Sequence, residues 1–211
     1  MPVFKSSHGL APFWCEMEYF EILRLRVGTA HAFARTGRKE RLIVGQGACT
    51  LRVDREMHQL CEGSAVDLPD EAKSVRVSNV MTKSVLIRVS GHWGDETGSC
   101  GVFTLFSSPH PSNSGDPTNY PRNTEFDNHY HDFDEYWIIF AGRGEVVTEG
   151  RRYEVRAGDC VATGKGHHHD FPWVSETVRG VWFETTLQGA RRLGHLWEHT
   201  HGIARPEMRR I

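Results

Sequence analysis

Long apolar runs, closely spaced cysteines and an excess of one charge are all missing from this chain of 211 residues. A membrane-spanning helix needs about 20 consecutive apolar residues, and no stretch of the sequence reaches that length. The formal net charge is only −2, which argues against a nucleic-acid or membrane-surface partner. The opening MPVFKSSHGLAPFW lacks the charged segment and apolar core of a signal peptide. We therefore expect neither nucleic acid nor membrane among the partners.

The five cysteines stand at positions 15, 49, 61, 100 and 160, so no CxxC pair exists. This spacing excludes a zinc knuckle and a thioredoxin-like redox site. Without an export signal, reduced thiols and a cytoplasmic location are expected. What the chain holds in quantity is histidine and glycine, with 13 and 21 residues.

Short apolar runs rich in Val, Ile, Phe, Trp and Tyr are separated by Gly, Asp, Ser and Pro turns. This pattern predicts an all-β sandwich or barrel. Only 187–200, near the end, is typical of a helix. The expected strands lie within 18–27, 40–53, 83–90, 100–106, 135–147 and 179–187.

A repeat at an offset of 95 residues relates the two halves of the chain. Residues 40–68 align without a gap with 135–163, and a turn glycine recurs seven residues after the first position of each segment. Farther on, the apolar pair at 86–87 aligns with the pair at 181–182. A fixed-period repeat of this length indicates a duplicated structural unit.

The boundary between the two units falls within 94–100. We therefore predict an N-terminal lobe over 1–96 and a C-terminal lobe over 97–211. A second irregular stretch, 107–126, is dense in Pro, Ser and Asn and cannot form a regular strand. It is either a functional lid or a disordered surface excursion, and the sequence favours neither.

Four residues of the second unit predict a metal site. In a strand, residues i and i+2 point to the same face, so His129 and His131 can aim inward together. Glu135 follows after a turn, and these three side chains form a ligand set that leaves metal positions open. His169, just after a glycine-rich turn, is the natural fourth ligand. An isolated HxH pair is weak evidence, because the chain has three of them.

The longer pattern around these histidines resembles the first motif of the cupin superfamily, G(x)5HxH(x)3–4E(x)6G. His129, His131, Glu135 and Gly142 match its positions in order. The leading glycine is replaced by Asn123.

The second cupin motif, G(x)5PxG(x)2H(x)3N, is also largely present. Gly158, Gly166 and His169 match, whereas Gly164 replaces the proline and Trp173 replaces the closing asparagine. The missing elements are turn or terminal positions, and all ligand positions are kept. The resemblance implies an all-β chain of two cupin barrels (jelly rolls) in tandem, with a short C-terminal helix.

The first lobe lacks the ligands. Subtracting 95 from the four ligand positions leads to Ala34, Thr36, Glu40 and Ser74, of which only the glutamate could bind a metal. Pro69 stands where the second motif has its proline. We therefore expect a degenerate N-terminal lobe and one metal site, in the C-terminal lobe.

Several further side chains are expected near the metal. If Glu135 faces inward, Trp137 on the same strand should do so too. Together with Trp182 it could form a pocket wall, although core filling explains both tryptophans equally well. His167 has the strand parity of His169, and we predict that it contacts the substrate along with the two tryptophans.

Glu184 is the candidate catalytic base. In the first lobe we expect Arg88 to point outward and its two neighbours inward. Transferring that parity by the repeat places Trp182 and Glu184 inward. A carboxylate inside an apolar barrel is costly unless it is used or paired. The alternative is a salt bridge with Arg179 or another arginine.

The tail contains HLWEH at 195–199, which spells the HxxEH motif of inverted metalloproteases. Only 12 residues follow His199, too few for a third ligand and a cleft. A helical tail that covers the barrel and buries Trp197 is expected instead.

A metal-dependent enzyme acting on a small polar substrate, a sugar or a hydroxy- or keto-acid, is the first functional hypothesis. One divalent ion (Mn, Fe, Zn or Ni) would polarise a substrate oxygen, and a base would move a proton, as in an isomerase or epimerase. Similar cupins also imply iron-dependent dioxygenase or manganese-dependent decarboxylase chemistry, and the ligand set does not choose. The second hypothesis is a non-catalytic small-molecule binder. The resemblance also implies a homodimer.

Overall fold

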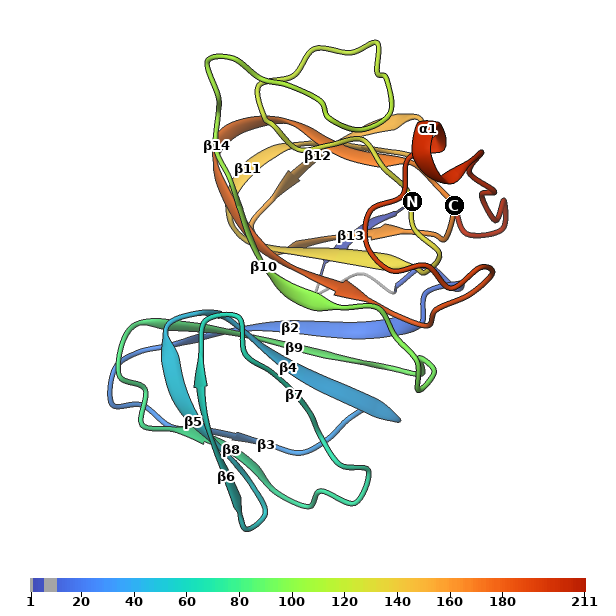
Figure 1. Cartoon of the computed structure of the whole chain (residues 1–211). Coiled ribbons are helices and arrows are strands. Elements are labelled where there is room, and N and C mark those ends of the chain that lie inside the picture. The colour runs from blue at the N-terminus through green and yellow to red at the C-terminus, as the bar shows by residue number, and fades with distance from the viewer. Residues whose placement is uncertain (1, 6–10) are drawn as a thin grey trace.

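The computed structural model describes residues 2–5 and 11–211, in which it contains 14 strands and one short helix (Figure 1). No helix among these residues is long and apolar enough to cross a membrane. The elements are β1 (Val3–Lys5), β2 (Met17–Leu25), β3 (His31–Phe33), β4 (Lys39–Gln46), β5 (Ala48–Val53), β6 (Glu56–Cys61), β7 (Ala65–Asp67), β8 (Val75–Ser78), β9 (Ser84–Gly91), β10 (Cys100–Leu105), β11 (Glu135–Thr148), β12 (Arg151–Arg156), β13 (Asp159–Thr163), β14 (His169–Glu184) and α1 (Glu198–His201).

The strands build two barrels, one above the other in Figure 1, which confirms the predicted all-β tandem. In the first barrel, the sheet β2-β9-β4-β7 faces the sheet β3-β8-β5-β6. Alternate residues of these strands, among them Leu42, Val44 and Leu86, fill the space between the two sheets. This alternation is the period of two that a strand with one face in a core requires.

The second barrel is a six-stranded sheet in the order β1-β13-β11-β14-β10, with β12 paired to β11. Both long strands, β11 and β14, bend at several register shifts and so contribute to opposite walls. Gly142 lies at one such shift, with φ +82, and a Cβ there would collide with the Thr177 carbonyl. Its repeat partner Gly47 also has φ +82. The duplicated turn thus depends on a backbone conformation that glycine adopts readily.

A shared hydrophobic core joins the barrels. Ile87 and Val89 of β9 pack in one cluster with Ile138 of β11 and Phe183 of β14. Because Leu86 on the same strand faces the interior of the first barrel, β9 is buried on both faces. The N-terminal strand β1 pairs with β13, so the first residues complete the sheet of the second barrel. The division at 96/97 stays a prediction.

The stretch 107–126 is irregular, as expected, but it is fastened to the barrel. The Thr124 hydroxyl donates to the Phe171 carbonyl at 2.5 Å, and Asn123 exchanges hydrogen bonds with Val174. Arg122 forms an ion pair of 2.5 Å with the fully buried Asp170. A disordered excursion is therefore the wrong description of this segment.

The short C-terminal helix is confirmed, but its predicted extent over 187–200 is wrong, because α1 covers only Glu198–His201. Gly189, Arg191 and Gly194 all have positive φ values, which interrupt a helix. Leu196 instead exchanges two backbone hydrogen bonds of 3.0 Å with Tyr130. The tail is thus drawn into extended pairing with the strand segment that carries His129 and His131.

Candidate metal centre

Four side chains, those of His129, His131, Glu135 and His169, converge inside the second barrel. One ligand atom from each lies within 4.8 Å of the others, and all four residues are buried. The backbones of His129 and His169 pair directly, through hydrogen bonds of 3.2 and 2.9 Å. The turn at 132–134 then brings Glu135, the first residue of β11, to the same point. The group could hold one metal ion.

Backbone carbonyls fix the orientation of all three imidazoles. Nδ1 of His129 lies 2.9 Å from the Asp127 carbonyl, and Nδ1 of His131 lies 2.9 Å from the Gly194 carbonyl. Nδ1 of His169 lies 3.0 Å from the His167 carbonyl. A carbonyl only accepts, so each Nδ1 carries a proton and each Nε2 of the neutral ring presents a lone pair to the centre. This arrangement is typical of histidines that bind a metal.

The Nε2 atoms have the environment that a cation would satisfy. Those of His129 and His131 are buried and make no hydrogen bond within the described part of the chain. Glu135 Oε2 lies 2.9 Å from His169 Nε2 and 3.3 Å from His131 Nε2. With the protons on Nδ1, these contacts set lone pairs against a carboxylate, which is unfavourable without a cation between them. Three nitrogens and one carboxylate oxygen fit a divalent transition metal.

Electrostatics keeps these groups in the protonation states that metal binding needs. Burial, and then the charge of His169, lower the pKa of His129 to about 3. Burial likewise lowers the pKa of His131. Burial alone would raise the pKa of Glu135. Without a metal, however, a proton on Nε2 of His131 or His169 would pair with its carboxylate, and this holds the pKa well below its usual range. Neutral imidazoles and an ionised carboxylate are the metal-binding forms.

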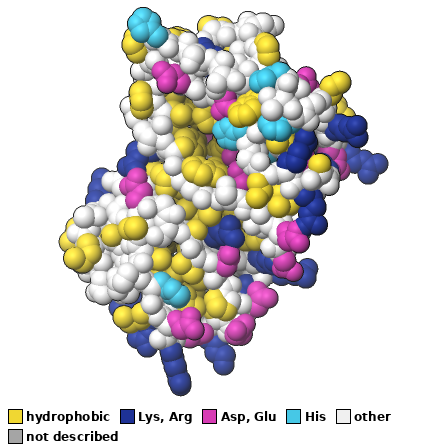
Figure 2. All heavy atoms as spheres, viewed as in Figure 1, with side chains coloured by type: hydrophobic (Ala, Val, Ile, Leu, Met, Phe, Trp, Pro, Cys, Tyr) yellow, Lys and Arg dark blue, Asp and Glu magenta, His cyan; other side chains and the backbone are white. Residues whose placement is uncertain are grey.

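A pocket of about 380 Å³ opens beside this group. Four aromatic rings and four polar side chains line it, and no Lys or Arg of the described residues does. Figure 2 shows hydrophobic, histidine and acidic side chains meeting in a recess of the upper barrel. The lining residues are Ser99, Phe103, Phe126, Glu135, Trp137, Trp182, Glu184, Gly194 and His195.

Glu184 also lines this pocket. It lies on β14, directly opposite Glu135 on the paired strand β11. Its Oε2 accepts hydrogen bonds from the Ser99 amide and from the Ser99 hydroxyl, the latter at 3.0 Å. Burial, and then the charge of Glu135, raise the pKa of Glu184 to about 7. Among the described residues, no salt bridge joins Glu184 to Arg179 or to another arginine, and Arg179 instead pairs with Glu62 at 2.8 Å.

Trp182 and Glu184 face inward, as predicted, but the prediction assumed the wrong orientation for Arg88 and the wrong repeat offset for the last strand, and these two errors cancel. Arg88 does not point outward: it is 4% exposed, and β9 aims its side chain into the first barrel. By strand pairing, Arg88 opposes Leu42 as Trp182 opposes Trp137, so the repeat offset in the last strand is 94. A one-residue slip reverses the face of every side chain.

In the first barrel, Arg88 contacts the counterparts of three of the four residues of the metal group. Its Nε lies 2.5 Å from Oε1 of Glu40, the counterpart of Glu135. Its Nη2 donates to the Ala34 carbonyl at 2.6 Å and to the Thr36 hydroxyl at 3.1 Å. Those two residues are the counterparts of His129 and His131. A guanidinium tethered to β9 thus supplies the positive charge beside Glu40.

Two predicted positions differ in the structure. His167 does not line the metal pocket, and its Nε2 lies 3.1 Å from the Glu207 carbonyl of the C-terminal tail. Its predicted contact with substrate has no support from this position. Trp197 is half-buried rather than buried, and the residue that the tail buries is Leu196.

Asp127 and His195 adjoin the metal group, and His195 also lines the pocket, but the sequence patterns missed both. The His195 ring stacks on His129, with 3.6 Å between centroids, and its Nδ1 lies 2.9 Å from Asp127 Oδ2. Trp197 Nε1 donates to the same oxygen at 2.8 Å. Although burial raises the pKa of Asp127, the hydrogen bonds of His129 and His195 lower it well below its usual range. The only sequence signal was His195 in the rejected HxxEH motif.

Comparisons with known proteins agree with this architecture. A family model described as a cupin domain matches residues 118–185. An uncharacterized protein, y4oW, from Sinorhizobium fredii is 44% identical over 210 residues, which cover 98% of this chain and 96% of that protein.

Solved structures show the same fold at low sequence identity. An IolB-like protein from Salmonella typhimurium has a TM-score of 0.55 at 12% identity, over 95% of this chain and 98% of that one. A variant of oxalate decarboxylase from Bacillus subtilis has a TM-score of 0.55 at 8% identity, over 84% and 70%. With its two barrels, its buried His-and-Glu group and this relative, the chain belongs to the cupin superfamily.

Proposed function

We propose that this protein is a metal-dependent enzyme that transfers a proton on a small polar substrate, as an isomerase or epimerase does. The observation that carries the proposal is the pair of carboxylates, Glu135 and Glu184, in one pocket with separate partners. Glu135 belongs to the metal group, whereas Glu184 is held by Ser99 and is free of it. A bound divalent ion would act as a Lewis acid on a substrate carbonyl or hydroxyl oxygen.

Glu184 is the base in this proposal. Both hydrogen bonds from Ser99 go to Oε2, so Oε1 accepts none from the described residues and is the atom that would take the proton. His195, which also lines the pocket, has Nδ1 engaged by Asp127, so its Nε2 is the atom that could return a proton. Two proton carriers in one pocket suit a reaction that removes a proton and adds it back.

The lining favours an uncharged substrate over an acid. Trp137, Trp182, Phe103 and Phe126 supply apolar faces, and the pocket has no Lys or Arg among the described residues to bind a substrate carboxylate. Aromatic rings pack well against the apolar face of a ring-shaped molecule. We therefore propose a neutral sugar, with Trp137 and Trp182 as substrate contacts.

Metal analysis of purified protein is the first test. We expect close to one Mn, Fe, Zn or Ni per chain in the wild type and almost none in His131→Ala, because the alanine removes the Nε2 atom that would bind the metal. His58→Ala, at a partly exposed histidine of β6 in the first barrel, is the matched control and should keep the metal. Equal metal in all three proteins would contradict the assigned centre.

Solvent-deuterium exchange into candidate sugars then tests the reaction. Glu184→Gln should keep the metal and lose the exchange, because the amide cannot accept the proton. Exchange that persists in Glu184→Gln would contradict the role of Glu184. A coloured protein that consumes oxygen would indicate an iron dioxygenase. Release of CO2 from an acid would indicate a decarboxylase, and binding of a sugar without turnover would indicate a non-catalytic binder.

A further inference from the structure

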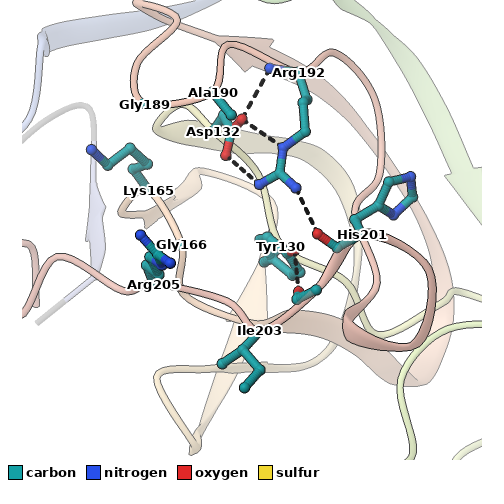
Figure 3. Close-up of a pocket in the computed structure, with 11 residues that line it drawn as sticks. Tyr130, Asp132, Lys165, Gly166, Gly189, Ala190, Arg192, His201, Ile203 and Arg205 are labelled. Carbon is teal, nitrogen blue, oxygen red and sulfur yellow. Dashed lines mark hydrogen bonds and ion pairs between the residues drawn. The ribbon is translucent and has the colours of Figure 1, made fainter.

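A second cavity, of about 520 Å³, lies on the other side of the segment that carries the metal ligands. His129 and His131 face the metal group, whereas Tyr130 and Asp132, the alternate residues, line this second cavity. The two cavities share no lining residue. Figure 3 shows the second cavity enclosed by the 129–132 segment, the 165–166 turn and the C-terminal tail.

The charges that line the second cavity do not balance. Lys165, Arg192 and Arg205 carry positive charge, and Asp132 is the only carboxylate among the lining residues. Arg192 pairs with that carboxylate: its Nε and Nη2 each donate a hydrogen bond of 2.9 Å to one of the two Asp132 oxygens. This fork-to-fork pair neutralises both partners. Two cations, Lys165 and Arg205, remain.

Neither of these two cations has a strong partner. Lys165 Nζ lies 3.9 Å from Glu207 Oε2, and Arg210 Nε lies closer to that same oxygen, at 3.1 Å. Arg205 is exposed and makes no ion pair or side-chain hydrogen bond within the described residues. Like charges held close together repel unless an anion lies between them.

Backbone packing holds the two cations on one wall of the cavity. Gly166, next to Lys165, has φ +77, and a Cβ there would collide with the Arg205 carbonyl. The Glu207 amide also donates to the Lys165 carbonyl, at 3.2 Å. The tail is therefore pressed against the 165–166 turn, and Lys165 and Arg205 lie on the same side of the cavity in Figure 3. The fold maintains this juxtaposition of like charges.

We propose that this second cavity binds a phosphate group, between Lys165 and Arg205. A phosphate carries close to two negative charges at neutral pH, which matches the two cations that lack strong partners. Arg offers planar paired donors and Lys a compact charge, a combination suited to phosphate oxygens. The source is either a small phosphate monoester or free inorganic phosphate.

Calorimetric titration of the metal-loaded protein with inorganic phosphate, at low ionic strength, tests the proposal. We expect one saturable site in the wild type and affinity at least tenfold weaker in Lys165→Met/Arg205→Met. Lys83→Met/Arg209→Met is the matched control, because it removes the same charges at exposed positions outside the cavity. The control should bind as the wild type does.

Two results would overturn the proposal: no saturable site in the wild type, or equal weakening in both double variants, which would indicate general charge attraction. Phosphate bound at the metal would survive in Lys165→Met/Arg205→Met with unchanged affinity and would also refute the site. A parallel titration with glycerol 3-phosphate distinguishes the sources, since tighter binding than inorganic phosphate indicates a monoester and equal binding indicates free phosphate. Because the cavities share no residue, failure here leaves the metal test intact.

Discussion

Glu135 and Glu184 oppose each other across two paired strands, yet their surroundings separate them chemically. His131 and His169 stabilise the charge on Glu135. Glu184 accepts hydrogen bonds from Ser99 alone among the described residues, and the charge of Glu135 lies nearby. The pKa of Glu135 is therefore lowered and that of Glu184 is raised to about 7. Carboxyl groups whose pKa values are pushed apart take different roles in one site.

Replacing Glu184 by Gln should stabilise the metal-free protein at high pH. A raised carboxyl pKa favours folding below the unfolded value of 4.5, and this contribution is lost as the pH rises through about 7. Gln keeps an acceptor for Ser99 and carries no charge. Urea unfolding followed by tryptophan fluorescence should show Glu184→Gln more stable than wild type by up to about 3 kcal/mol at pH 8.

That stability difference should vanish at a pH well below the unfolded value of 4.5, where the wild-type carboxyl is protonated in both the folded and the unfolded state. Glu184→Gln that is less stable than wild type at both pH values would contradict the assigned environment. Added metal should reduce the difference at pH 8, because a cation beside Glu135 offsets the charge that raises the pKa of Glu184.

At the scale of elements, β4 and β9 of the first barrel preserve the geometry of the site without its ligands. Glu40 comes from β4 and Arg88 from β9, and both are nearly fully buried, at 1% and 4% exposed. Such a pair adds little net stability compared with apolar residues, but either partner alone is a costly buried charge.

Arg88→Met should therefore cost about 3–5 kcal/mol of unfolding free energy, because Glu40 loses its partner. The double variant Glu40→Gln/Arg88→Met should recover a large part of that loss. Arg76→Met, at an exposed position of β8, is the control and should change stability by less than about 0.5 kcal/mol. Chemical denaturation measures all three, and an Arg88→Met no costlier than Arg76→Met would refute the pairing.

The whole molecule is joined by the core between the barrels. β9 is buried on both faces, because one of its faces packs against the second barrel. The second barrel in turn includes β1, from the start of the chain, in its sheet. A shared core of this kind couples the unfolding of both barrels.

Ile87→Ala should accordingly lower the stability of both barrels together, by about 2–5 kcal/mol. Ile87 belongs to the first barrel, yet it packs in the cluster that contains Ile138 and Phe183 of the second. Circular dichroism and metal release should report the same single transition, shifted equally by the substitution. Metal release that stays at the wild-type midpoint would show that the barrels unfold independently.

The sequence by itself determined the features that depend on neighbouring residues. The parity of His129 and His131, the spacing to Glu135 and the turn glycines of the repeat are local, and a duplicated pattern predicts duplicated barrels. These relations require no knowledge of what pairs with what across the molecule.

Only the tertiary structure decided the features that depend on strand register and on packing between distant segments. Strand register sets the orientation of Arg88 and the offset of 94 in the last strand. Packing of the tail against the barrel places the His195 ring in a stack on His129. The segment before α1 is extended rather than helical, because the backbone of Leu196 forms hydrogen bonds with Tyr130. Local patterns do not carry this information, because one residue of slip or one distant hydrogen bond reverses the outcome.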